Sequence, residues 1–146
     1  MLLTDEYFMQ LALNEAEKAF DKGEIPIGCV IVSNDLVIAK AHNMTETLND
    51  VTAHAEMQAF TAASEYLGSK YLTDCIMYVT LEPCLMCLGA SYWTHIHEIV
   101  YGANDNKRRN NIDKKQILHP KTQIKGGVLD EKCSQLLRNF FEAKRL

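Results

Sequence analysis

The clearest structural signal in this 146-residue chain is the stretch CIMYVTLEPCLMC, at residues 75–87. Its first seven residues are apolar or β-branched, which is typical of a buried strand. Pro83 ends that strand, because proline has no N–H for a sheet and suits the first position of a helix. We therefore expect a helix that starts at Pro83 and runs to about Trp93.

Upstream and downstream of this stretch, helical and strand patterns alternate. Thr4 is a good helix cap, and Asn34-Asp35 is typical of a tight turn between two strands. Strands interleaved with helices predict one layered α/β domain over residues 1–146. A polar, basic stretch at 104–121 is expected to be a long loop. Further helices are expected near 4–22, from Thr52 or His54 to about Tyr66, and near 130–141. Further strands are expected at 27–32, 36–39, 99–103 and 123–124.

Composition favours a soluble globular protein over a disordered or disulfide-stabilised one, since 47% of residues are hydrophobic and 23% are charged. The first residues form neither a basic leader nor a long apolar run, which favours a cytoplasmic protein with no membrane partner. The net charge of −4 is unevenly distributed. Residues 1–106 carry four Lys or Arg against fifteen Asp or Glu, whereas residues 107–146 carry eleven against four. The basic end suggests contact with a polyanion; an ordinary solvated surface is the alternative.

His54-Ala55-Glu56, together with Cys84 and Cys87, forms a candidate metal site. One imidazole and two thiolates are a set that zinc prefers, and cysteines three apart at a helix N-terminus can face one ion. The helix dipole there favours thiolates. Neither motif has a good fourth ligand beside it, which leaves one coordination position for water, as in catalytic zinc sites. We expect one Zn²⁺ per chain, bound by His54, Cys84 and Cys87.

Glu56 is expected to carry protons rather than to bind the metal. Residues two apart in a regular helix point in different directions, so His54 and Glu56 converge only where the chain enters a helix. Asp50 and Thr52 stand where a capping residue belongs. Zinc lowers the pKa of a bound water from about 16 toward about 7. Glu56 can then take a proton from that water and deliver it to the substrate.

The other cysteines and histidines have simpler interpretations. A lone Cys-x-x-Cys also occurs in redox pairs and structural zinc sites, but the upstream His-x-Glu favours a catalytic metal. Cys29 and Cys75 lie in apolar runs and are expected to be small buried hydrophobes. Four further histidines are candidate fourth ligands: His42, His95, His97 and His119. Surface or packing roles are favoured for His95 and His97.

The pattern His-x-Glu followed by Pro-Cys-x-x-Cys resembles the signature of zinc deaminases that act on nucleobases. More of the chain is similar to one family among them, the bacterial tRNA-specific adenosine deaminases. The matching residues are 24–28, Asn43, 50–56, 78–87, 101–105, 118–120, 140–141 and 144–145. The resemblance implies a three-layer α/β/α cytidine deaminase-like fold with a five-stranded mixed sheet. It also implies conversion of the wobble adenosine of a tRNA anticodon loop to inosine, by a homodimer whose active site takes residues from both subunits.

The resemblance further implies roles for single residues: zinc binding for His54, Cys84 and Cys87, proton transfer for Glu56, and binding of the flipped base for Asn43. The residues expected to line the base pocket are Ile25, Thr45, Ala55 and Leu81. Those that fall where the family contacts RNA are Asp105, Lys107, Phe141, Lys144 and Arg145. At least one member of the Phe140-Phe141 pair is expected to pack in the core instead.

Two other functions fit part of the sequence. A free-base or nucleoside deaminase, above all a guanine deaminase, has the same zinc motifs and a similar Tyr92-Trp93 pair, but it gives no reason for the basic C-terminal end. The second alternative is a metal-bound module that binds nucleic acid without catalytic activity. Glu56 argues against it, because a structural metal site does not need a carboxylate beside its ligands. Where the family typically has a Gly-containing loop of small residues, this chain has Arg-Arg-Asn-Asn-Ile at 108–112, which is shorter and more basic. This difference bears on the choice of RNA.

Overall fold

A mixed sheet of five strands, in the order β2-β1-β3-β4-β5, organises the computed structural model, which describes residues 3–105 and 113–144. The strands are β1 (Gly28–Ser33), β2 (Leu36–His42), β3 (Cys75–Leu81), β4 (Glu98–Ala103) and β5 (Gln123–Lys125). Strand β1 is antiparallel to both β2 and β3, whereas β3, β4 and β5 are parallel. The connections between the parallel strands therefore cross over, and helices occupy them.

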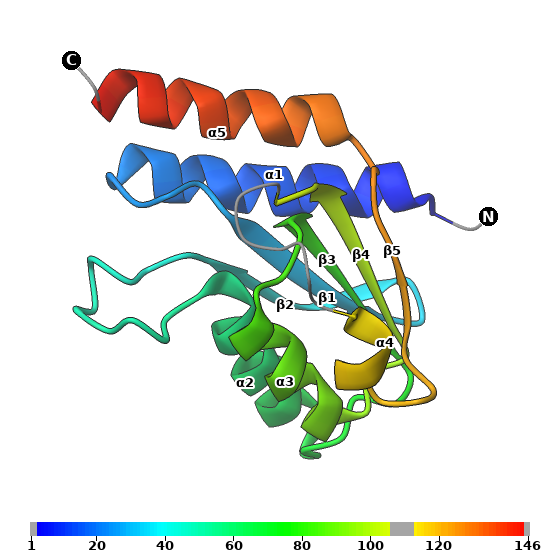
Figure 1. Ribbon diagram of the computed structural model, residues 1–146. Coiled ribbons are helices and arrows are strands. Elements are labelled where there is room, and N and C mark those ends of the chain that lie inside the picture. Colours follow the sequence, from blue (N-terminus) through cyan, green and yellow to red (C-terminus); the bar gives the residue numbers. More distant parts are fainter. Residues whose placement is uncertain (1–2, 106–112, 145–146) are drawn as a thin grey trace.

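Helices cover both faces of this sheet (Figure 1). They are α1 (Asp5–Asp21), α2 (Ala55–Leu67), α3 (Leu85–Thr94), α4 (Lys114–Ile117) and α5 (Asp130–Lys144). Helices α1 and α5 lie on one face, and α2, α3 and the short α4 lie on the other (Figure 1). The expected three-layer α/β/α fold with a five-stranded mixed sheet is confirmed.

The alternation of side chains along β1 explains why both faces are covered. Cys29 and Ile31 are buried in the cluster shared with α2 and α3, whereas Val30 and Val32 are buried in the cluster shared with α1 and α5. Successive residues of a strand point to opposite faces, so an unbroken apolar strand needs a layer on each side. Gly28 at the start of β1 lies so close to the backbone of α1 that a Cβ atom would collide with it.

The expected local signals at the N-terminal end are present. The Thr4 hydroxyl accepts a hydrogen bond of 3.1 Å from the Tyr7 N–H and caps α1. Asn34 and Asp35 both have positive φ, as a type I′ turn between β1 and β2 requires.

The two helices that carry the metal motifs start slightly later than expected. His54 itself is the N-cap of α2, in extended conformation, and Asp50 instead accepts bonds from the N–H and hydroxyl of Thr52 ahead of the helix. Cys84 is the N-cap of α3, so Pro83 precedes the helix rather than occupying its first position. Both motifs therefore straddle the point where the chain enters a helix.

The stretch 104–121, expected to be a loop, contains a short helix in its described part. The Asp113 carboxylate caps α4 by accepting from the Lys115 N–H at 3.0 Å, and Leu118 after the helix is buried in the core. A single turn is too short to show helical periodicity, so the sequence pattern missed it. Across residues 3–105 and 113–144, none of the helices has the length and apolar character needed to cross a bilayer.

Candidate active site

The N-termini of α2 and α3 bring three candidate ligands together. The Nδ1 atom of His54 lies 3.6 Å from the Sγ of Cys84 and 3.6 Å from the Sγ of Cys87. In the described part of the chain, these are the residues whose ligand atoms form a group, all within 4.8 Å of one another. A tetrahedral zinc ion with ordinary bond lengths separates nitrogen from sulfur by about 3.5 Å. The donor set and its spacing therefore fit one zinc ion.

Cys84 and Cys87 are linked electrostatically as well as by position. A hydrogen bond from the Cys87 thiol lowers the pKa of Cys84 to about 3, and His54 acts in the same direction. Donating that bond, together with burial, raises the pKa of Cys87 above its usual value. A cation between the two sulfurs favours the thiolate form of both.

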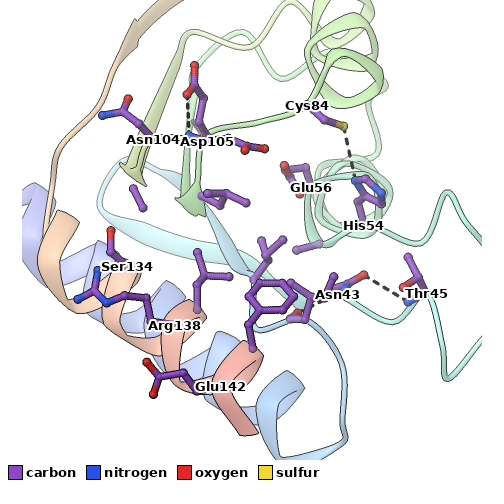
Figure 2. Close-up of a pocket in the computed structure, with 18 residues that line it drawn as sticks. Asn43, Thr45, His54, Glu56, Cys84, Asn104, Asp105, Ser134, Arg138 and Glu142 are labelled. Atoms are coloured by element: carbon purple, nitrogen blue, oxygen red, sulfur yellow. Dashed lines mark hydrogen bonds between the residues drawn. The ribbon is translucent and has the colours of Figure 1, made fainter. Parts of the chain in front are cut away.

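Glu56 lies in the first turn of α2, beside the candidate ligands but outside their group. Its side chain is only 4% exposed, and Figure 2 shows it next to His54 at the wall of the pocket. Burial, together with the nearby Cys84 charge, raises the pKa of Glu56 to about 7. The extended conformation of His54 at the N-cap is what brings residues two apart to one place. The expected convergence of His54 and Glu56 is thus confirmed.

His54, Glu56 and Cys84 form one end of a pocket of about 580 Å³ (Figure 2). All five residues expected to contact the base line it: Ile25, Asn43, Thr45, Ala55 and Leu81. Asp105 and Phe141 line it too, whereas Lys144, on the last turn of α5, does not. Lys107 and Arg145 lie outside the described residues. The structure therefore places most of the candidate residues at one cavity, and their contacts with substrate stay predictions.

Asn43 is held in the pocket wall by its own side chain. Its Nδ2 donates to the Ile25 carbonyl at 3.3 Å, and its Oδ1 accepts from the Thr45 N–H at 3.3 Å (Figure 2). The fully buried Glu24 anchors the loop that follows, because its carboxylate accepts from the Glu46 N–H at 3.0 Å and from both the N–H and the hydroxyl of Thr47 at 2.6 Å. Sequence reasoning did not single out Glu24, although it belongs to the stretch shared with the deaminases.

Glu82, at the end of β3, fixes the rim of the pocket and was also missed. Its Oε1 accepts from the Asp105 N–H at 3.0 Å, and its Oε2 forms an ion pair with Lys114 of α4. One carboxylate thus ties two points that flank residues 106–112. No spacing rule links these three residues, since the crossover between β3 and β4 separates them.

Helix α5 contributes residues to the pocket that the sequence did not suggest. The missed lining residues are Ile27, Glu82, Ala103, Asn104, Ser134, Leu137, Arg138 and Glu142. Ser134, Arg138 and Glu142 are polar, four residues apart, and on one face of α5 (Figure 2). That spacing was the available signal, but it is also typical of an exposed helix face. Phe140 is buried and Phe141 is 40% exposed, so the expectation that one of the two packs in the core is confirmed.

The other histidines and cysteines have structural surroundings. The ring of His95 stacks on Tyr71 at 4.7 Å and lies 4.4 Å from that of His119, while His42 contacts the Glu15 carboxylate at 3.3 Å. Cys29 and Cys75 are buried and unpaired, as expected. None of these residues belongs to the metal-ligand group formed within the described residues.

Comparisons with known proteins agree with this geometry. A family model for the cytidine and deoxycytidylate deaminase zinc-binding region matches residues 3–103. The tRNA-specific adenosine deaminase of Aquifex aeolicus is 43% identical over 144 residues, which are 96% of this chain and 95% of that protein. The chain belongs to the tRNA-specific adenosine deaminase family. The Bacillus subtilis member of this family is 40% identical over 97% of this chain and 91% of its own length. The metal of this deaminase is zinc.

Solved structures similar to this deaminase include proteins named for tRNA and proteins named for a free base. One, from a study of A-to-I editing by tRNA:A34 deaminases at the wobble position, has a TM-score of 0.80 and 36% identity, covering 89% of this chain and 98% of its own. The guanine deaminase of Bacillus subtilis has a TM-score of 0.67 and 41% identity, over 70% of this chain and 66% of its own. That of Nitrosomonas europaea, with a TM-score of 0.86 over 96% of this chain and 86% of its own, is 21% identical and shares the fold. Fold alone therefore does not separate deaminases named for tRNA from those named for a free base.

Proposed function

We propose that this deaminase acts in the cytoplasm on the wobble adenosine of a tRNA anticodon loop and converts it to inosine. The observation that carries the proposal is the open pocket itself. His54, Cys84 and Glu56 form one end, and helix α5, with the 40% exposed Phe141, forms the opposite wall. An aromatic ring at a pocket entrance can stack on a base of a single-stranded loop. The near full-length similarity to proteins named tRNA-specific adenosine deaminases supports the same substrate.

The reaction replaces an amino group by oxygen, and its atoms balance with one water. Zinc, when bound, makes a water molecule nucleophilic at neutral pH. The C6–O bond forms, the C6–N bond breaks, and ammonia leaves. Glu56 accepts one proton from the water and donates it to the departing nitrogen. Its place beside the ligands, buried and within reach of the pocket, supports this role.

The base is proposed to lie between the apolar side chains of Ile25 and Leu81, over Ala55. Asn43 would bind the polar edge of the base, because its amide is already oriented by the Ile25 carbonyl and the Thr45 N–H. An amide uses four hydrogen-bonding sites, so two bonds to the protein leave capacity for the substrate. This arrangement would fix C6 against the metal end of the pocket.

The strand that carries the target base is proposed to pass over the pocket mouth. Asp105 and Phe141 line the pocket, and Lys107, Lys144 and Arg145 belong to the basic C-terminal part of the chain. Cations there would bind phosphates on either side of the flipped nucleotide.

A homodimer is proposed from an exposed aromatic surface on α3. Trp93 is 73% exposed and packs edge-on against Tyr92, while Leu85, next to the ligand Cys84, is also exposed. Large apolar side chains grouped on one surface indicate an interface. A partner on α3 would lie close to the metal end of the pocket, which suits an active site shared between subunits.

Trp93→Asp is therefore expected to convert a dimer into a monomer, because a buried interfacial carboxylate would have no partner. Sedimentation velocity measures this directly. Tyr7→Asp, at an exposed aromatic residue of α1 on the opposite face of the sheet, is the matched control and should remain dimeric. If Trp93→Asp sediments as the parent does, the α3 surface is not the interface.

The assay that tests the function compares RNA with a free base. We expect inosine to form in unmodified tRNA that has adenosine at the wobble position, and no ammonia from free guanine. Guanine deaminase remains the second candidate because a protein of that name is 41% identical over 70% of this chain. Ammonia from guanine with no inosine in tRNA would favour that activity and reject the proposed one. No product from either substrate would favour a metal-bound module without activity.

A further inference from the structure

We infer that Arg138 is a phosphate-binding residue that selects an RNA strand over a free base. This inference rests on the proposed function, because it assigns a contact to the RNA strand that carries the target nucleotide. Arg138 lies on α5 and lines the same pocket as the metal ligands, at the wall opposite to them (Figure 2). Its guanidinium extends to the side of the pocket away from His54 (Figure 2). A group in this position reaches the backbone next to a flipped base rather than the base itself.

The charged residues that line the pocket are mostly acidic, and Arg138 is the exception. Four carboxylates line the pocket: Glu56, Glu82, Asp105 and Glu142. Arg138 is the one Lys or Arg among the described lining residues. Among the charged side chains that line the pocket, a phosphate is therefore attracted by this guanidinium and repelled by the carboxylates. A strand entering the pocket gains one favourable contact here and avoids repulsion by placing a phosphate beside it.

The guanidinium is also available for a ligand. Its Nη2 atom donates to Glu131 at 2.7 Å and to Gln135 at 2.8 Å, and both acceptors lie on the same helix, α5. The Arg138 side chain is 49% exposed and that of Glu131 is 84% exposed. An ion pair this exposed contributes little and is readily exchanged. The remaining N–H groups of the fork can bind a phosphate in the two-bond geometry that arginine favours.

The test combines a variant with a neutralised phosphate. A series of anticodon stem-loops is made, each with a single uncharged methylphosphonate in place of one phosphate that flanks the target adenosine. Binding is measured in a Glu56→Ala background, which prevents turnover. Arg138→Gln is expected to weaken binding of the unmodified stem-loop about tenfold. The slope of log affinity against log salt concentration should become shallower by about 0.7, the value for one lost phosphate contact on a single strand. At one position, methylphosphonate should weaken binding by the parent but have no further effect on Arg138→Gln.

Two control variants separate phosphate binding from helix stability. Lys132→Gln removes an exposed cation on the same helix that does not line the pocket, and should leave the methylphosphonate effect intact. Glu131→Gln breaks the ion pair with Arg138 and frees the guanidinium, so binding should be unchanged or tighter. If Glu131→Gln weakens binding as much as Arg138→Gln does, the ion pair itself is what matters, and the inference is wrong.

The remaining outcomes distinguish this inference from the proposed function. If the parent enzyme forms inosine in the stem-loop and Arg138→Gln binds it equally well at every salt concentration, the inference fails and the function stands. If the parent forms no inosine in the stem-loop or in tRNA and releases ammonia from guanine, both fail together. Arg138→Gln should keep the zinc content and the melting temperature of the parent. These two measurements show that any difference in binding comes from the lost guanidinium and not from unfolding.

Discussion

Glu56→Ala is expected to keep one zinc ion per chain while losing about 10²–10⁴ in deamination rate. The carboxylate lies outside the group formed by His54, Cys84 and Cys87, so its removal leaves all three ligands in place. What disappears is the group that accepts a proton from water and returns it to the leaving nitrogen. Zinc content measured on the purified variant, together with single-turnover rates on tRNA, separates the two effects.

The matched control for Glu56 is another carboxylate of the same pocket. Glu142 lines the mouth from α5 and is exposed, far along the helix from the metal end. Glu142→Ala should keep zinc and should change the single-turnover rate far less than Glu56→Ala does. Loss of stoichiometric zinc from Glu56→Ala would show instead that the carboxylate is a ligand, and the assigned proton transfer would then be wrong.

The metal end of this site was predictable because its signals are short-range. Cys84 and Cys87 are three residues apart at one helix start, and His54 and Glu56 are two apart at another. Each motif is brought to its position by the local geometry of a helix N-terminus. The apolar strand Cys75–Leu81 before the cysteines also indicates a buried position at the centre of the sheet. Motif and fold therefore point to the same place.

The opposite wall could not be derived in the same way. Arg138 reaches the pocket only because α5 packs beside α1 across the sheet, after two parallel crossovers. The four-residue spacing between Ser134 and Arg138 predicts that they share one face of a helix, but it does not predict which part of the protein that face lies against. The ion pair between Glu82 and Lys114 likewise depends on a turn of helix too short to show periodicity. Charge counting indicated a basic C-terminal end but not which cation faces the cavity.

Cys87→Ser is expected to lose zinc and activity together, which is the largest effect on this enzyme. Cys87 is fully buried in the first turn of α3, so no exposed side chain can take the place of its sulfur as a metal ligand. A serine hydroxyl does not ionise near neutral pH and is a poor ligand for zinc. The two remaining protein ligands, His54 and Cys84, come from different helices. Loss of the metal should therefore also weaken the link between α2 and α3.

Metal release and melting temperature measured together test this expectation. Bound zinc stabilises the folded chain by mass action, so a chelator should lower the melting temperature of the parent but not that of Cys87→Ser. Cys75→Ser is the matched control, because Cys75 is equally buried but lies in the core at the start of β3. It should destabilise the fold by about 1–3 kcal/mol through its buried hydroxyl while keeping zinc and its response to the chelator. Full zinc content in Cys87→Ser would mean that the ion is held by other residues, and the ligand set proposed for this pocket would have to be replaced.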